Sequence, residues 1–207
     1  MTTKSEQRLN FLLRMYDQLC SEINTHILVV WQSIAAIVGA FTILALVEKN
    51  IISFHIAVSL IFLICGWSIA HSIDAGYWYN RNLAIITNIE KQFLLKTDVE
   101  DIHYYFGKTR EENKMILHLK IQLWFASAIM ALMLIYHFYS TLKLVVCAPT
   151  LDFAFLFPYG TLIVVLITLL IIKRDRDKSY KNFITNSPGK FIDVGDIDTS
   201  LGHGNIH

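Results

Sequence analysis

The fold is decided by two long apolar stretches, residues 27–47 and 51–73, which read ILVVWQSIAAIVGAFTILALV and IISFHIAVSLIFLICGWSIAHSI. Neither stretch contains Asp, Glu, Lys or Arg, and only Glu48, Lys49 and Asn50 separate them. A helix of about 20 residues, rising about 1.5 Å per residue, crosses a hydrocarbon core of roughly 30 Å. The two stretches therefore predict a transmembrane helical hairpin.

A second pair of apolar stretches, residues 121–139 and 154–172, has a similar length and also lacks these charged residues. The composition agrees, because 17% of the chain is charged against roughly 25% in soluble domains. We therefore predict an all-α fold, an integral membrane four-helix bundle with hairpins at 27–73 and 121–172. Residues 1–26 contain acidic side chains and no cleavage site follows the first span, which predicts that this span is retained.

The cationic residues are distributed unevenly along the chain. Sixteen of the eighteen Lys and Arg residues lie in segments 1–26, 74–120 and 173–207, and only Lys49 and Lys143 lie in the hairpin turns. Because cationic segments resist translocation, both termini and the central segment are predicted to be cytoplasmic. The formal net charge of +1 gives no field that would attract nucleic acid, so no direct nucleic-acid binding is expected.

The predicted cytoplasmic segments carry apolar residues at helical spacing. Residues 1–26 are predicted to form an amphipathic helix, and residues 74–120 to extend the second and third spans inward. Ahead of the third span, Thr109 is predicted to cap a helix whose first turn contains Glu111 and Glu112. The apolar stripes are expected to pack as a helical layer beneath the membrane, either as an intramolecular core or as part of an oligomer seam.

The tail, residues 173–207, begins with charged residues that continue the fourth span, and Pro188 and Gly189 then indicate a turn. Its five possible metal ligands lack the spacing of a calcium loop; they are Asp193, Asp196, Asp198, His203 and His207. The three cysteines form no C-x-x-C pair, which excludes zinc ribbons and disulfide scaffolds; they are Cys20, Cys65 and Cys147. We therefore expect neither a metal nor another cofactor.

Four polar residues near the inner end of the second span are candidates for contact with a partner or an anion: His71, Asp74, Arg81 and Glu90. His71 and Asp74 stand three residues apart, so they could share a proton, bind a cation or form a hydrogen-bonded pair at the interface. Arg81 and Glu90 belong to the pattern W-Y-N-R-N followed by N-I-E in residues 78–90. This pattern indicates either a polar seam that fixes helix register or a vestibule beneath the membrane.

Polar residues inside the predicted spans are few. Gln32, Ser33 and Gly39 mark a possible pore-lining or packing face of the first span, because intramembrane polar residues tend to face other helices or water. His55 and His137 are also placed inside spans. Apart from histidine, no acidic or basic residue lies mid-span, which argues against a charged selectivity ring.

Enzymatic signatures are missing from the sequence. It contains no P-loop, H-E-x-x-H, G-x-S-x-G or G-x-G-x-x-G motif. An enzyme acting on lipid would have only His71 and Asp74 as a centre. The sequence therefore favours a non-enzymatic protein.

The four spans, the short outer turns and the inward helical extensions resemble the small bacterial membrane proteins of the SLATT type. The resemblance covers residues 5–140 and includes the pattern at 78–90. The layout is also similar to four-span accessory proteins encoded beside RNA-guided nucleases and to the membrane subunit of the Kiwa defence system. The resemblance implies a homo-oligomeric inner-membrane effector or sensor of antiphage defence that responds to a cytoplasmic protein partner. The alternative is a passive anchor, scaffold or accessory subunit of a transporter or other complex.

Overall fold

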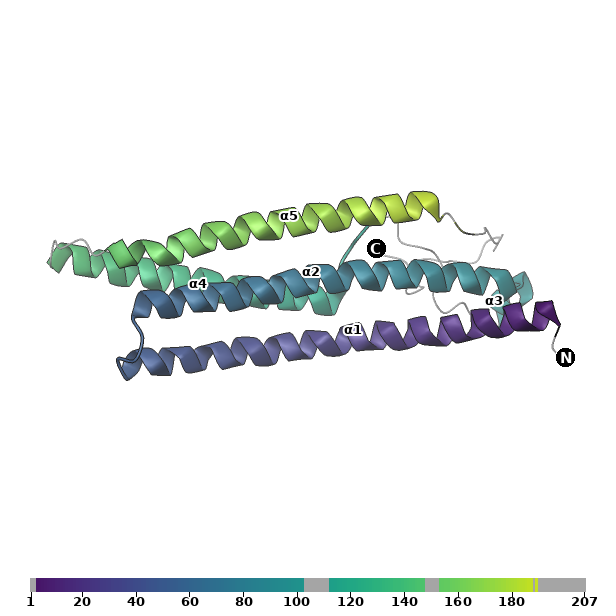
Figure 1. Cartoon of the computed structure of the whole chain (residues 1–207), viewed down its shortest axis with the longest axis horizontal. Coiled ribbons are helices and arrows are strands. Elements are labelled where there is room, and N and C mark those ends of the chain that lie inside the picture. Colours follow the sequence, from purple (N-terminus) through teal and green to yellow (C-terminus); the bar gives the residue numbers. More distant parts are fainter. Residues whose placement is uncertain (1–2, 103–111, 148–152, 188, 190–207) are drawn as a thin grey trace. The chain divides into compact units, whose positions relative to one another are not determined.

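The computed structural model describes residues 3–102, 112–147, 153–187 and 189. Within these ranges every regular element is a helix, and Figure 1 shows their order along the chain. The elements are α1 (Lys4–Glu48), α2 (Phe54–Phe93), α3 (Lys96–Ile102), α4 (Leu117–Cys147), the 3₁₀-helix η1 (Phe153–Leu156) and α5 (Phe157–Asn186). The predicted all-α class is confirmed.

Three helical stretches in the described ranges are long and apolar enough to cross a bilayer: Phe54–Phe93, Leu117–Leu142 and Phe153–Asn186. These stretches contain the predicted third and fourth spans and all of the predicted second span except residues 51–53, which lie in the turn before α2. The predicted first span lies within α1, where the described residues include an apolar helical segment at Ile37–Glu48. The structure therefore supports a multi-pass membrane protein. The predicted first span, which would bring the number of spans to four, stays a prediction.

The turn between α1 and α2 is closed by backbone hydrogen bonds. The N–H of Ile51 donates to the carbonyl of Leu46 and that of Asn50 to the carbonyl of Val47, both at 2.9 Å. Asn50 has φ of 56°, and this pair of bonds around a left-handed residue is the Schellman motif that ends many helices. On the other side, Ser53 Oγ accepts a 3.3 Å hydrogen bond from the N–H of Ile56 and caps α2.

The chain divides into two compact units. The apolar unit comprises residues 29–74 and 115–175, and the polar unit comprises residues 1–28, 75–114 and 176–207. Helices α1, α2 and α5 each contribute residues to both units without a break in the helix.

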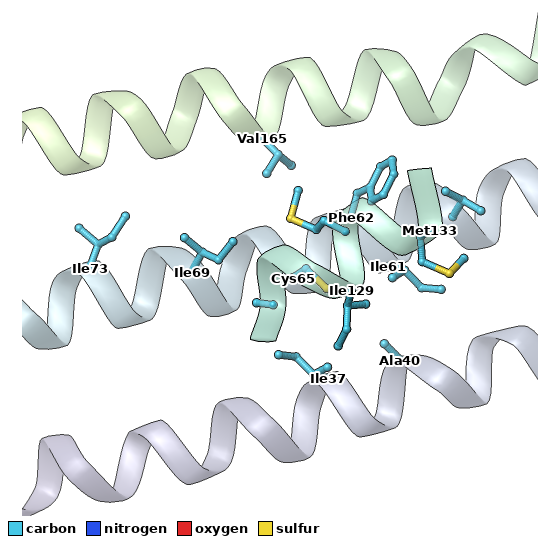
Figure 2. Packing of buried hydrophobic residues seen from close by; sticks show 13 residues of the cluster. Ile37, Ala40, Ile61, Phe62, Cys65, Ile69, Ile73, Ile129, Met133 and Val165 are labelled. Carbon is cyan, nitrogen blue, oxygen red and sulfur yellow. The ribbon is translucent and has the colours of Figure 1, made fainter. Parts of the chain in front are cut away.

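In the apolar unit, α2 supplies more of the buried hydrophobic core than any other helix. Figure 2 shows side chains of α1, α2, α4 and α5 meeting around this core. Its buried members are Ile37, Ala40, Val58, Ile61, Phe62, Cys65, Ile69, Ile73, Ala126, Ile129, Met130, Met133 and Val165. The most apolar window of α2 is 56% buried, whereas that of the η1–α5 stretch is 11% buried. Helix α2 is therefore the inner helix of this unit, and α5 presents most of its apolar side chains outward.

The contact between α2 and α5 in the apolar unit depends on a residue without a side chain. A Cβ atom built on Gly66 of α2 would lie 2.5 Å from Cγ1 of Val165 on α5. Real carbon atoms do not approach so closely, and a valine cannot move its methyl groups away by bending a long side chain. Gly66 therefore sets the spacing of these helices at this level.

In the polar unit, α2 is enclosed on most sides. Its buried residues are Ala75, Tyr77, Tyr79, Asn80, Asn82, Leu83, Ala84, Ile86, Thr87, Ile89 and Glu90. They are joined by Leu19 and Ile23 of α1 and by Tyr180 of α5. The apolar stripe predicted for residues 1–26 is buried at Leu19 and Ile23, whereas Leu9 and Leu13 on the same stripe are exposed.

Candidate functional site

The pattern at residues 78–90 lies on α2 inside the polar unit, and four of its polar side chains are buried. The exposed fraction is 1% for Asn80, zero for Asn82 and Thr87, and 9% for Glu90. A buried polar group costs free energy unless it is hydrogen-bonded, so its partners reveal its role. We use the term α2 polar cluster for Asn80, Arg81, Asn82, Asn88 and Glu90 together with the side chains they contact.

Asn80 connects α2 to the segment before α4 and, through it, to α5. Its Nδ2 donates to the Oδ1 of Asn113 and to the carbonyl of Lys114, both at 2.9 Å. Asn113 Nδ2 in turn donates to the Oδ1 of Asp177 on α5 at 3.1 Å. One buried amide thus links three separate parts of the chain.

These contacts correct one prediction. The helix expected from Thr109 onward was to include Glu112, but residues 112–116 are not helical and α4 begins at Leu117. Backbone groups that are hydrogen-bonded to partners outside a helix do not need an intrahelical partner. Here the carbonyl of Lys114 accepts a hydrogen bond from Asn80 Nδ2, and the N–H of Lys114 donates to the carbonyl of Glu112 at 2.8 Å. Thr109 and Glu111 lie outside the described residues.

Two further hydrogen bonds connect α2 to α1. Asn82 Nδ2 donates to the Oε2 of Glu22, and the Tyr16 hydroxyl donates to the Oε1 of Glu90, each at 3.1 Å. Glu90, predicted to contact a partner or an anion, thus contacts a tyrosine of its own chain. The two bonds join residues 60 and 74 positions apart, and they fix the register of α1 against α2.

Arg81 lies between aromatic rings of two helices. Its guanidinium carbon is 5.2 Å from the ring centre of Trp78 on α2 and 5.3 Å from that of Phe183 on α5. Arg176 of α5 makes a similar contact with Tyr77 at 4.9 Å. Such cation–π contacts contribute about 0.5–2 kcal/mol each, depending on how far the cation is removed from water. Arg81 therefore helps to hold α5 on α2.

Asn88 meets the end of α5. Its Nδ2 lies 3.5 Å from the carbonyl of Ser187, which makes this the weakest hydrogen bond of the cluster. Beyond it, Gly189 has φ of 72°, and a Cβ there would collide with the Asn88 side chain. The turn predicted at Pro188 and Gly189 therefore includes a position that only glycine fills without strain, and Pro188 lies outside the described residues.

Burial and the Glu90 carboxylate also affect two ionisable groups of α1. Burial in the polar unit, with the negative charge of Glu90, holds the pKa of the Tyr16 hydroxyl well above its usual range. The same two effects raise the pKa of the Cys20 thiol, which also hydrogen-bonds with Tyr16. Both groups are therefore neutral at physiological pH, and Cys20 is a poor nucleophile.

The reactivity of the Cys20 thiol reports on the negative charge of Glu90. In a chain carrying Cys65→Ser and Cys147→Ser, we expect Glu90→Gln to increase the rate of Cys20 alkylation by iodoacetamide, roughly two- to tenfold near pH 8. The reason is that removing the charge lowers the thiol pKa, while the amide still accepts the Tyr16 hydrogen bond.

Alkylation rates measured across pH separate charge from accessibility, because a pKa change moves the midpoint of the profile and leaves its plateau unchanged. Glu6→Gln, which removes an exposed carboxylate from the same helix, is the matched control and should leave the profile unchanged. An unmoved midpoint in Glu90→Gln would show that the Glu90 charge does not act on Cys20.

The four residues predicted to contact a partner or an anion are divided between the two units. Arg81 and Glu90 belong to the polar unit and bind different side chains, while His71 and Asp74 belong to the apolar unit. The His71 ring packs edge-on against Trp67 of its own helix at 4.5 Å between ring centres, and Asp74 is half-buried. The partner or anion contact predicted for these residues is not tested by these observations.

On α1, Gln32 and Gly39 are exposed, and the side chain of Ser33 lies outside the described residues. A Cβ built on Gly39 would meet no atom within 4 Å. The face predicted to line a pore or pack against a helix is thus open at these two positions.

A second group of polar side chains lies in the apolar unit, where no sequence motif pairs them. His55 Nδ1 of α2 is 2.8 Å from His137 Nε2 of α4, and His137 Nδ1 is 3.2 Å from the Tyr159 hydroxyl of α5. His55 lies near the start of the second predicted span and His137 near the end of the third. Because these spans are predicted to run in opposite directions, the two histidines share one depth, and this signal could have identified them.

The described residues contain no group of three or more His, Cys, Asp and Glu side chains placed to hold a metal ion. The apolar unit has a pocket of about 390 Å³, and its lining carries no ionisable side chain; it is formed by Leu63, Phe153, Leu156, Phe157, Gly160, Thr161 and Val164. The five possible metal ligands of the tail, which lie between Asp193 and His207 and for which no metal was expected, are outside the described residues. The α2 polar cluster joins helices, and the arrangement supports a structural role for its residues.

Comparison of the chain with protein-family models, with curated proteins and with solved structures gave no match. The resemblance to the SLATT type and to Kiwa-like membrane subunits therefore stays a prediction. The function is argued below from the geometry of the two units.

Proposed function

We propose that this chain is a non-enzymatic, oligomeric inner-membrane subunit that acts as an effector or sensor in bacterial antiphage defence. The observation that carries the proposal is the α2 polar cluster. Its polar and charged residues connect α2 to α1, to residues 113–114 and to α5. Residues used in this way stabilise one arrangement of helices, and a change in that arrangement is what a signal relay requires.

The proposed topology has four spans with both termini in the cytoplasm. The first span rests on α1, which is a single helix from Lys4 to Glu48 and includes an apolar segment at Ile37–Glu48. The orientation rests on the cationic residues, sixteen of which would then face the cytoplasm.

The proposed oligomer forms through an exposed face of α1. The face repeats at helical spacing and consists of Leu28, Trp31, Gln32, Ala35, Val38, Gly39, Thr42 and Leu46. A glutamine amide facing lipid leaves its hydrogen-bonding groups unsatisfied, whereas the same amide against a second copy finds a partner. Gly39 and Ala35 would allow two such helices to approach closely.

The test is the mass of the assembly in detergent and in lipid nanodiscs. We expect the wild-type chain to be oligomeric and Gly39→Leu to shift it toward monomer, because the leucine would separate the facing helices. The fold should persist, since no atom of the chain lies within 4 Å of the added carbon. Gly160→Leu is the matched control, because Gly160 is equally open but lies on α5.

The proposed activity is measured in bacteria by membrane potential during phage infection. Cells expressing the wild-type chain and its cytoplasmic partner should depolarise, and cells expressing Gly39→Leu should not. A wild-type chain that is monomeric at every concentration would contradict the oligomer. An assembled chain that never alters membrane potential would instead favour the passive anchor or accessory subunit.

A further inference from the structure

Three polar side chains from three helices form a continuous hydrogen-bonded chain in the apolar unit. They are His55 of α2, His137 of α4 and Tyr159 of α5. His137 is fully buried, and the ring of Phe54 stacks on it at 5.7 Å with an angle of 22°. Both of its ring nitrogens are occupied, Nε2 by His55 and Nδ1 by Tyr159. His55 is half-buried.

The number of protons in this chain determines whether its hydrogen bonds can all form. A neutral imidazole has one N–H donor and one acceptor nitrogen, so a neutral His137 can donate to one neighbour and accept from the other. If the pair gains one proton on His137, this ring donates both to His55 Nδ1 and to the Tyr159 oxygen, and both bonds persist. If each imidazole carries an extra proton, two N–H groups face each other across 2.8 Å and the contact must break.

We infer that His55 and His137 form a proton-binding site that accepts one proton beyond the neutral pair and excludes a second while the helices stay packed. The ligand is a proton, which lies in the short contact between His55 Nδ1 and His137 Nε2. The Tyr159 oxygen then accepts the hydrogen bond that His137 Nδ1 donates. This inference concerns the packing of α2, α4 and α5 in the apolar unit, so it does not depend on the proposed defence role.

The distance between the nitrogens favours a proton over a metal ion. Two histidines that bind one tetrahedral zinc ion at about 2.0–2.1 Å place their nitrogens roughly 3.3 Å apart. The observed separation of 2.8 Å matches an N–H···N hydrogen bond. The third member is a tyrosine, and the described residues provide no carboxylate or thiol that completes a metal site here.

The other ionisable groups around the site supply no compensating charge. Helix α4 contributes Tyr136, whose ring meets Phe54 edge-on at 5.5 Å, and α5 contributes Tyr159. Helix α2 contributes His55 itself, and the charged residues at the end of α1 and its turn, Glu48 and Lys49, are exposed. No acid among the described contacts pairs with either imidazole, so the first bound proton is stabilised by being shared between them.

The first test detects the shared proton in the full-length chain in lipid nanodiscs. In ¹⁵N-histidine spectra we expect a coupling between His55 Nδ1 and His137 Nε2 across the hydrogen bond, and uptake of one proton by the pair as pH falls. His55→Gln should abolish the coupling. His71→Gln, which removes a histidine whose described ring contact is with Trp67, is the control and should leave the coupling intact. Two independent proton uptakes, or stoichiometric Zn²⁺ binding lost in His55→Gln, would overturn the inference.

A second test uses the pH dependence of unfolding and tolerates variants that fold poorly. The unfolded chain binds two protons on these histidines below about pH 6, whereas the packed pair is inferred to bind one. The free energy of unfolding that this pair contributes is therefore present at neutral pH and is lost as pH falls. For each unit by which pH falls, the pair should raise the unfolding equilibrium constant by up to about tenfold.

The double variant His55→Gln/His137→Gln keeps donors and acceptors at both positions but cannot take up protons. In mixed micelles we expect it to lose this part of the pH dependence, and His71→Gln to retain it. If the double variant and the wild-type chain show the same pH dependence, the proton-binding site is disproved.

Discussion

Replacing Asn80 by Asp should destabilise the polar unit while leaving the stability of the apolar unit unchanged. The substitution changes shape little but replaces the Nδ2 donor by an oxygen that faces the Lys114 carbonyl and the Asn113 Oδ1 at the distance of a hydrogen bond. Asn113 can rotate its amide, whereas the backbone carbonyl cannot become a donor. A buried charge placed against an acceptor costs about 2–4 kcal/mol in this setting.

Hydrogen exchange with mass spectrometry resolves the two units. Amides of the polar unit, in peptides covering 4–28, 75–102 and 176–187, should exchange roughly 30- to 1000-fold faster in Asn80→Asp. Asn80→Ala should have a smaller effect, because it removes the bonds without adding an opposing charge. Asn182→Asp, at an exposed position of α5, is the matched control. If Asn80→Asp and Asn80→Ala are equally stable, the side chain at position 80 does not face the Lys114 carbonyl closely enough for their hydrogen bond to stabilise the polar unit.

Gly66→Leu should disrupt the packing of α2 and α5 in the apolar unit. The first added carbon would lie 2.5 Å from Val165 Cγ1, and the remaining side chain needs space that the helices do not provide. Overpacking commonly costs about 1–3 kcal/mol, and we expect this substitution to reach or exceed the upper value. The readout is the unfolding equilibrium in mixed micelles.

Two comparisons isolate the clash. Gly160→Leu gains the same helix propensity but meets no atom within 4 Å at Cβ, so it should be close to wild type. Gly66→Ala should also be destabilised, because its Cβ would lie 2.5 Å from Val165 Cγ1. The double variant Gly66→Ala/Val165→Ala should regain stability, because the two Cβ atoms then lie at an ordinary contact distance of 3.5 Å. A Gly66→Leu chain as stable as Gly160→Leu would show that α5 does not pack at this position.

Those features of the fold that depend on local sequence were predictable. The spans at 51–73, 121–139 and 154–172 follow from length and hydropathy, since a bilayer imposes both. The continuation of α2 to Phe93 was also predictable, because no proline or glycine cluster interrupts its periodic pattern. The start of α4 was not, because long-range side-chain contacts from Asn80 and Asp177 hold residues 113–114 outside a helix.

For the candidate site, the sequence singled out Arg81 and Glu90 in the pattern at 78–90 but not the side chains that they contact. Whether this pattern is a polar seam or borders a vestibule stays a prediction. The partners of these two residues, Tyr16 and Phe183, are separated from them by many residues and have no pattern of their own. Pairing of this kind depends on which helix faces meet, and one sequence does not contain that information.

The outward position of α5 has a consequence for how this protein can diverge. Its apolar stretch needs to be hydrophobic but fits few specific neighbours, since only 11% of its window is buried. Isoleucine, leucine and valine should therefore interchange freely there during evolution. Selection on this helix should be concentrated at the residues that meet α2 or its cluster: Val165, Arg176, Asp177 and Phe183. Distant homologues are best recognised by those four positions.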